Sequence, residues 1–188
     1  VTDQRNDWGP SIQQAREEGF DGIVYRNEYE DKRSDSYIAF RSEQIKSTSN
    51  LRPSNGPDIF DRMPAGLEDV QAAGAADDLG RWFGKSQIVD AKGSPLVVYR
   101  GEGGGDNFRG EGGEDAFVAF DRRKTQENAF FFSPEESIAR DYAGGRDPRA
   151  FYLKAENVLD LTTDSRQGME SIREWAKARD VDSWIDRS

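Results

Sequence analysis

Cysteine and histidine are both absent from this chain of 188 residues. Without them the chain can form no disulfide, no thiolate or imidazole metal site, no cysteine nucleophile and no catalytic triad that relies on histidine. Carboxylates that bind Mg²⁺ or Ca²⁺ stay open as an alternative, although no series of Asp and Asn side chains has the spacing of a calcium-binding loop. The absence of cysteine is compatible with any redox compartment.

Long apolar runs and a leader sequence are also missing. No run of about 18 apolar residues occurs, so the sequence predicts no membrane-spanning segment and no membrane partner. The first residues, Val1 to Gln4, do not have the pattern of a signal peptide. Because the chain does not begin with Met, we expect it to start inside a longer polypeptide.

Positive charge is scarce relative to negative charge. The 26 Lys and Arg residues against 36 Asp and Glu give a formal net charge of -10, and the pI is near 4.7. An acidic chain binds polyphosphates poorly, so we expect neither nucleic acid nor an anionic membrane as a partner. An anionic ligand would need a local cluster of arginine or a nest of backbone N–H groups.

The length and the aromatic content favour a single domain, 1–188. A hydrophobic fraction of 35% beside a charged fraction of 33% predicts a modest core and a wet surface. The chain contains 4 Trp, 6 Tyr and 11 Phe, which supply much of the apolar surface that such a core would bury.

Branched and aromatic residues predict short strands, with helices between them. The strand segments are 22–26, 36–40, 95–99, 129–132 and 150–153, with an extended piece at 158–161. The hydrophobic spacing predicts helices at 12–18, 67–83, 135–142 and 169–178. Ser11 is expected to cap the first helix and Ser133 the third, with Pro134 at the first helical position. Segments 87–90 and 95–99 form a predicted hairpin around a glycine turn.

Three connections differ in character. Segment 27–35 is strongly charged. Segment 47–66 is punctuated by Ser, Asn, Pro and Gly and is interpreted as a linker or surface arm, with anchors at Ile59, Phe60 and Met63. The glycine-rich segment 103–113 is interpreted as a flexible loop, because its glycines lack the spacing of a P-loop or a dinucleotide fingerprint.

The stretch 96–102 is the most informative part of the chain. Its apolar residues end at Tyr99, and Arg100 and Gly101 follow directly. A strand that ends in this way places a guanidinium at the rim of a sheet, and the glycine allows a turn or a close approach. The alternative is a strand end that carries a solvated arginine.

Several segments together resemble the ADP-ribosyltransferase fold. The closest resemblance is to the ADP-ribosyltransferase-like domains of polyvalent proteins of phages and mobile elements. The opening of that family resembles WFGKSQIVD at 82–90 with GSPLVVY at 93–99, and its second motif resembles FFS at 131–133 with ARDYA at 139–143. Its closing motif resembles GFDGIVYRN at 19–27, SYIAF at 36–40 and QIK at 44–46.

The motif order is rearranged, because the closing motif comes first. Residues 1–46 resemble the C-terminal part of the family and 67–188 its N-terminal part, with 47–66 as the linker. A circular permutation, a cut across two tandem copies and a dimer that exchanges the first segment would each explain this order. In all three cases we expect residues 1–46 to pair with a sheet formed by residues 87–161. The resemblance implies an α+β fold of two packed small antiparallel sheets with flanking helices.

The resemblance also implies a reaction and candidate site residues. The reaction is NAD-dependent transfer of ADP-ribose to a protein acceptor, with release of nicotinamide through an oxocarbenium-like transition state. Glu28 and Glu30 form a Glu-x-Glu pair like that of the arginine-specific class, and Arg100 matches the arginine of the arginine–serine–glutamate class, where the polyvalent family often carries His. Ser36 stands where poly-ADP-ribose polymerases open the last strand with a glutamate.

Each candidate residue has a role implied by the resemblance and an ordinary structural alternative. Glu28 or Glu30 would hold the ribose and stabilise positive charge, or both are solvated loop charges. Arg100 would bind the diphosphate, or lies at the surface. Ser133 would hold the strand end or the ribose, or caps a helix. The remaining candidates for NAD binding, of which the phenylalanines can equally be core residues, are Tyr99, Gly101, Phe131, Phe132, Tyr142 and Ser36.

Three functions are compatible with this sequence. The first is an ADP-ribosyltransferase that uses NAD as substrate and modifies a host protein, cytoplasmic or delivered into a host cell as part of a larger protein. The second is a degenerate domain that binds NAD or a protein without turnover, which Ser36 favours. The third is a structural or interaction domain of a larger injected phage protein.

Overall fold

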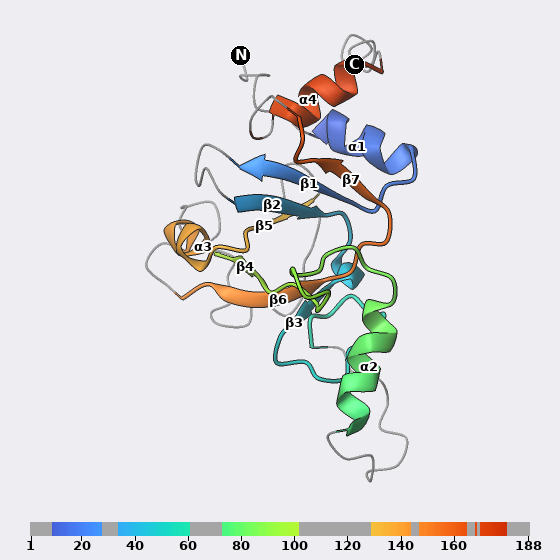
Figure 1. The fold of residues 1–188 in the computed structure, drawn as a ribbon, viewed down its shortest axis with the longest axis vertical. Helices are drawn as coiled ribbons and strands as arrows, with labels where there is room; N and C mark the ends of the chain where they lie inside the picture. The colour runs from blue at the N-terminus through green and yellow to red at the C-terminus, as the bar shows by residue number, and fades with distance from the viewer. Residues whose placement is uncertain are drawn as a thin grey trace, which may run out of the picture.

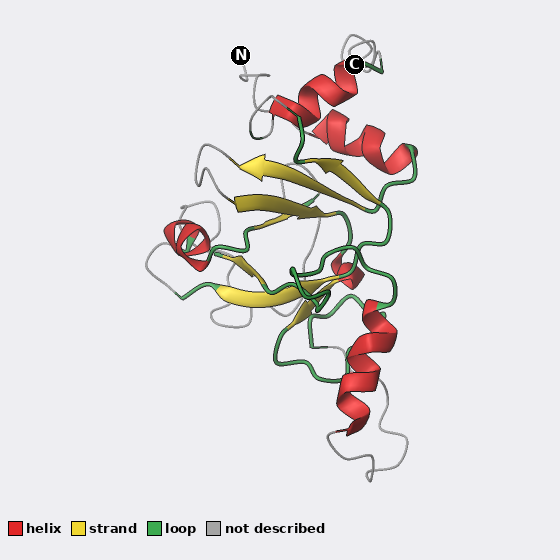
Figure 2. Ribbon diagram, in the orientation of Figure 1, coloured by secondary structure: helices red, strands yellow, loops and turns green. Residues whose placement is uncertain are grey.

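The computed structural model describes residues 9–27, 34–60, 73–101, 129–143, 147–164, 168 and 170–179. Within these residues the chain is an α+β protein with two small, mostly antiparallel sheets and four α-helices. The two sheets lie one above the other, and helices flank them (Figures 1 and 2). The predicted α+β class with two small sheets is therefore confirmed.

The larger sheet contains four strands in the order β5-β2-β1-β7. β1 (Gly22–Asn27) and β2 (Ser34–Ala39) form an antiparallel pair. β5 (Phe130–Phe132) pairs antiparallel with β2, and β7 (Val158–Leu161) pairs parallel with β1. These strands lie close to the segments that the branched and aromatic residues predicted.

The smaller sheet contains three strands in the order β3-β6-β4. β6 (Arg149–Leu153) lies between β3 (Ile45–Ser47) and β4 (Val98–Arg100), and both pairs are antiparallel. The predicted hairpin is present, since Val89 pairs with Pro95 and Gly93 turns the chain with a φ of 81°. Its second segment, however, continues into β4 and pairs with β6.

Four α-helices lie in the described part of the chain: α1 (Gly9–Glu17), α2 (Ala73–Phe83), α3 (Glu136–Tyr142) and α4 (Glu170–Lys177). A single 3-10 turn, η2 (Ser42–Gln44), precedes β3. α1 and α4 pack side by side above the four-stranded sheet, and α3 lies beside β4 (Figure 1).

Both predicted serine caps are wrong. Ser11 lies inside α1 and is buried, because the helix already begins at Gly9. The N-cap of α3 is Glu135, and Ser133 instead accepts a hydrogen bond from the Glu135 N–H at 3.0 Å, two residues ahead of it. A serine before a proline favours such a local turn as readily as a cap.

Two clusters of buried side chains form the core. The outer core lies between the four-stranded sheet and the helices α1 and α4, and includes Ile12, Ile23, Ile38 and Ile172. The inter-sheet core lies between the two sheets and contains Ala39, Phe130, Phe132, Val98, Phe151 and Leu153. Each sheet therefore has an inner face, which faces the other sheet.

The predicted pairing of residues 1–46 with the later strands is confirmed within one chain. β1 pairs with β7, β2 pairs with β5 and β3 pairs with β6. The segment after β3 is tied to the same unit, because Ile59 is fully buried and the Lys46 ammonium donates to the Gly56 and Asp58 carbonyls at 2.6 Å each. Ile59 is thus an anchor as predicted, Phe60 is 40% exposed and is not, and Met63 lies outside the described residues.

Candidate functional site

The two sheets meet where β4 and β5 end. Tyr99 N–H donates to the Ser133 carbonyl at 2.7 Å, and Ser133 N–H donates to the Tyr99 carbonyl at 3.0 Å. This backbone pair joins the end of the three-stranded sheet to the end of the four-stranded sheet. Tyr99, Arg100, Phe132 and Ser133, which come from segments about thirty residues apart in sequence, are therefore neighbours.

Arg100 lies on the inner face of its sheet. It shares this face with Val98, since side chains alternate along a strand, and Val98 is part of the inter-sheet core. Its Nη1 donates to the Phe131 carbonyl at 2.9 Å, and its guanidinium carbon lies 5.9 Å from the centre of the Phe132 ring. The guanidinium is therefore held against β5, an edge strand of the four-stranded sheet, with the Phe132 ring beside it.

Ser36 and the Phe131 side chain lie on the other face of the four-stranded sheet. Tyr37 packs against the inter-sheet core, while the next residue, Ile38, belongs to the outer core. By the same alternation Ser36 faces the helices, where it is 4% exposed and its hydroxyl accepts from Asn27 Nδ2 at 3.0 Å. Phe131 packs against the outer core as well. The candidate site residues are thus divided between two faces.

Gly101 has a packing role that accounts for its identity. A Cβ at this position would lie 1.8 Å from the Ala139 carbonyl oxygen and 2.6 Å from the Ala143 nitrogen. The backbone of α3 therefore rests directly on the end of β4, which only a glycine permits. Tyr142, the last residue of α3, is 57% exposed and so presents its ring at the surface.

Tyr37 lies on the inner face of the upper sheet, within the influence of two carboxylates. Its pKa is raised to about 12, mainly by burial and in smaller part by the negative charges of Asp35 and Asp160. Asp35 in turn forms an ion pair with Arg26, the residue opposite it on β1, at 2.8 Å. Tyr37 also stands directly opposite Phe132 on β5.

Glu28 and Glu30 lie outside the described residues. The strand residues before and after them, Asn27 and Ser34, form the last pair of the β1–β2 hairpin. Because Tyr37 is opposite Phe132, this connected end of the hairpin extends past the end of β5, where the chain reaches Ser133. In Figure 1 the same side of the molecule carries α3. The connected end of the hairpin is thus directed toward the side on which Arg100 lies.

The sequence interpretation missed Tyr37 and Arg149 as members of this region. Arg149 is the first residue of β6 and stands directly opposite Arg100 in the ladder. Nothing in its local sequence marks it, because the pairing of β4 with β6 joins segments about fifty residues apart. Tyr37 lay within the SYIAF segment, and its position relative to Ser36 was the available signal.

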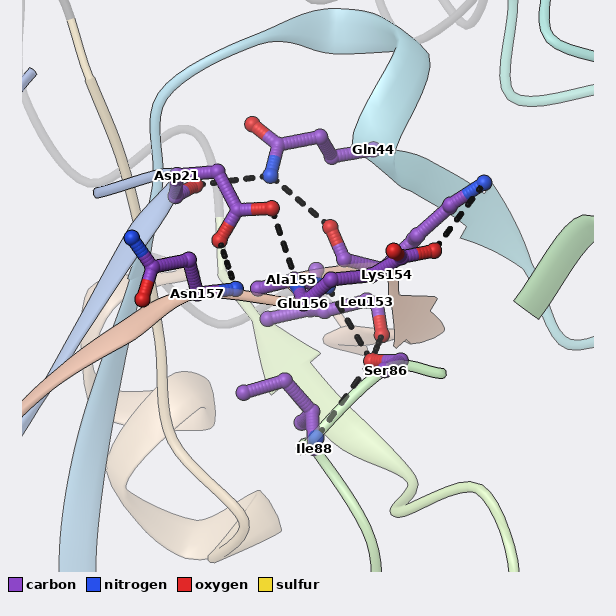
Figure 3. A network of polar contacts seen from close by, with 9 residues as sticks. All are labelled: Asp21, Gln44, Ser86, Ile88, Leu153, Lys154, Ala155, Glu156 and Asn157. Atoms are coloured by element: carbon purple, nitrogen blue, oxygen red, sulfur yellow. Dashed lines mark hydrogen bonds and ion pairs between the residues drawn. The ribbon is translucent and has the colours of Figure 1, made fainter. Parts of the chain in front are cut away.

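The opposite end of the interface is a network that fixes the turn between β6 and β7 (Figure 3). Asp21 accepts from the Glu156 and Asn157 N–H groups at 2.8 and 2.9 Å. Ser86 donates to the Leu153 carbonyl at 3.1 Å and accepts from Ala155 N–H at 3.0 Å.

Gln44 completes this network and has no capacity left for a ligand. Its Oε1 accepts from Phe40 N–H at 3.1 Å and Arg41 N–H at 2.8 Å, and its Nε2 donates to the Asp21 and Lys154 carbonyls at 2.7 and 2.8 Å. Two acceptor and two donor positions are the whole inventory of a glutamine side chain. The QIK segment therefore has a structural role here, which is to bind the first 46 residues to the rest of the fold.

Neither a metal centre nor a membrane span is present among the described residues. No group of Asp and Glu side chains there could hold a metal ion, and no helix there has the length and apolarity needed to cross a membrane. No protein-family model, curated protein or solved structure matches the chain. A function for this chain therefore has to be supported by the geometry and chemistry of its own residues.

Proposed function

We propose that this chain is an NAD-dependent ADP-ribosyltransferase domain that transfers ADP-ribose to a protein. The observation that carries the proposal is the backbone pair between Tyr99 and Ser133. It supports the proposal because it brings together Arg100 and Phe132, a cation and an aromatic face, where the ends of the two sheets meet. A dinucleotide with a diphosphate and a cationic nicotinamide ring requires both kinds of group.

The proposed reaction breaks the bond between the ribose C1′ and the nicotinamide nitrogen. Nicotinamide leaves with the bonding electrons, the acceptor side chain forms the new bond to C1′, and the acceptor's proton passes to a base or to water. Positive charge develops on the ribose, so a carboxylate nearby stabilises the transition state. Glu28 or Glu30 supplies that carboxylate in this proposal, since both lie in the sequence between β1 and β2.

The pairing of the first segment within its own chain argues against segment exchange between two copies, and it is compatible with a circular permutation or with a cut across two tandem copies. β1, β2 and β3 all find partners among later strands of the same chain. A second copy is therefore not needed to complete either sheet. In this proposal the domain is related to the ADP-ribosyltransferase-like domains of phage and mobile-element polyvalent proteins.

A second candidate is a degenerate domain that binds NAD or a protein without turnover. The specific observation in its favour is Ser36, which stands where a catalytic glutamate is expected and whose hydroxyl is engaged by Asn27 on the face opposite Arg100. Under this alternative the nucleotide binds beside Arg100, and no carboxylate reaches the ribose.

Labelled NAD and a host lysate distinguish the two candidates. We expect the unmodified chain to transfer label to protein and to release nicotinamide, and we expect Arg100→Ala and the double variant Glu28→Gln/Glu30→Gln each to lose at least about a hundredfold in rate, the usual size of one charge-stabilising group. Glu43→Gln, which removes an exposed carboxylate of η2, is the matched control and should keep full activity.

The outcomes separate clearly if folding is checked by thermal melting. Binding of NAD by the unmodified chain and by Glu28→Gln/Glu30→Gln, with no labelled protein and no released nicotinamide, supports the degenerate domain. Full transferase activity in both site variants would show that the roles assigned to these residues are wrong. The absence of any NAD-induced rise in melting temperature would favour a purely structural domain.

A further inference from the structure

We propose that Asn55 is a site of spontaneous deamidation, and that its isoaspartate product loosens the segment that Lys46 holds in place. This segment, residues 47–59, is called the 47–59 loop below. It lies beside α2, at the end of the molecule opposite α1 and α4 (Figure 1). The modification needs no reactant other than water, and it does not depend on the proposed function.

Asn55 combines the sequence and the exposure that this reaction requires. Of the asparagines in the chain, only Asn55 is followed directly by a glycine. Because Gly56 has no Cβ, its backbone nitrogen can approach the preceding side chain without steric hindrance. Asn55 is exposed and its side chain forms no hydrogen bond within the described residues, so water reaches it and nothing there holds its amide away from Gly56.

The reaction joins the side chain of Asn55 to the backbone of Gly56. Hydroxide or water removes the Gly56 N–H proton, and the nitrogen attacks Asn55 Cγ. The Cγ–Nδ2 bond then breaks, and the amide nitrogen takes up a proton and leaves as ammonia. Water opens the cyclic imide at either carbonyl. One product is aspartate, and the other is isoaspartate, in which the main chain runs through the former side chain and is one methylene longer.

The product forms inside a loop whose backbone is held at defined points. Lys46 is fully buried, and its ammonium donates to the Gly56 and Asp58 carbonyls at 2.6 Å each. The base of the 47–59 loop is closed by the Ser47 N–H, which donates to the Ile59 carbonyl at 3.2 Å. The modified residue therefore directly precedes the first carbonyl that the buried ammonium binds.

An extra methylene at this point displaces the Gly56 carbonyl from the Lys46 ammonium. Burying an ammonium is tolerated where hydrogen bonds replace its hydration, so the loss of one acceptor destabilises the folded chain. The aspartate product keeps the length of the main chain and leaves the carbonyl in place. Isoaspartate therefore loosens the 47–59 loop, whereas aspartate only adds a charge at the surface.

Peptide mapping by mass spectrometry, after incubation of the full chain at several pH values, tests the modification site. We expect conversion of the Asn55 amide to an acid, with isoaspartate among the products and a rate that rises with hydroxide concentration. Asn157 is the internal control, because it is also exposed but is followed by the branched Val158, and it should stay unchanged. Asn55→Gln should stay unmodified, because its longer side chain would have to close a larger ring.

The isoaspartate form, separated by chromatography, tests the link to Lys46. It should melt about 3–12 °C below the unmodified chain, the effect of losing one hydrogen bond to a charged group in a chain of this size. Lys46 should also become reactive toward an amine-labelling reagent. Asn55→Asp, which reproduces the other product, is the matched control and should keep both the melting temperature and the protection of Lys46.

Two results would overturn the inference, and neither bears on NAD cleavage. If Asn55 stays unchanged for as long as Asn157 does, the modification site is wrong. If the isoaspartate form melts with Asn55→Asp and protects Lys46 equally well, deamidation does not loosen the 47–59 loop and that part of the inference is wrong.

Discussion

Tyr37 is the residue at which burial and charge act together on one titratable group. Burial above all, with Asp35 and Asp160 acting in the same direction, raises its pKa to about 12. An unfolded tyrosine loses its proton near pH 10. Between these two values the unfolded chain therefore holds fewer protons than the folded chain, so the free energy of unfolding falls as the pH rises.

We expect this loss of stability between pH 10 and pH 12 to be smaller in Tyr37→Phe, which keeps the ring but has no proton to lose. The difference between the two chains should be at most about 3 kcal/mol, from two pKa units. Chemical denaturation at each pH measures it. Tyr152→Phe, on β6, is the matched control. Equal slopes for Tyr37→Phe and the unmodified chain would contradict this assignment.

Neighbouring residues in one strand face opposite sides of the sheet, and the sequence alone did not reveal which side each residue faces. Ser36 and Tyr37 were part of the same predicted strand, yet one faces the helices and the other faces the second sheet. The alternation itself was predictable. The face that looks toward Arg100 depends on how the sheets stack, and this is decided by contacts between distant segments. Ser36 was therefore grouped with Arg100 although its side chain points away from it.

At the scale of elements, the backbone of α3 packs so closely against the end of β4 that Gly101 leaves no room for a side chain. Gly101→Ala would place a methyl group against the Ala139 carbonyl and the Ala143 nitrogen, both of them backbone atoms that cannot rotate away. We expect α3 to shift and the free energy of unfolding to fall by about 1–3 kcal/mol, as for other overpacked sites.

Gly80→Ala, inside α2, is the matched control for this substitution. A Cβ there would have no atom within 4 Å, so the change should stabilise the chain by about 1 kcal/mol through helix propensity alone. Urea denaturation of both variants measures the two opposite effects. If Gly101→Ala were as stable as the unmodified chain, the close approach of α3 to β4 would be wrong.

Local patterns located most elements but not their partners. The strands β1, β5, β6 and β7 lie close to their predicted segments because runs of branched and aromatic residues have a strong local signature. β3 was not among the predicted strands, since three residues are too few to show a period. The caps failed because Ser11 and Ser133 can form hydrogen bonds both inside and before a helix.

At the scale of the whole molecule, the expectation that 1–46 would join a sheet of later strands came from the rearranged motifs. Its confirmation does not depend on which explanation of the order is correct. The detailed arrangement of the site was less accessible, because Arg149 and Arg100 become neighbours through the pairing of β4 with β6. No short-range pattern encodes such a pairing. The network around Gln44 was hidden for the same reason, since its four partners come from three separate segments.

Because the first segment pairs with later strands of its own chain, we expect a disulfide engineered between the two segments to form within one chain. Thr48 N–H donates to the Ala150 carbonyl at 3.2 Å just beyond the β3–β6 ladder. Opposed residues in such a pair have the separation that a disulfide requires. Because the chain has no cysteine of its own, the double variant Thr48→Cys/Ala150→Cys offers a single pair of thiols.

We expect oxidation of this variant to give a disulfide-linked monomer at every protein concentration, seen on a non-reducing gel. The bond closes a loop of about a hundred residues, so it should raise the free energy of unfolding by about 2–4 kcal/mol. Thr48→Cys alone is the control and should show neither effect. A chain that exchanged its first segment with a neighbour would instead form disulfide-linked dimers, and their yield would rise with concentration. Such dimers would favour exchange of the first segment between two copies over its pairing within one chain.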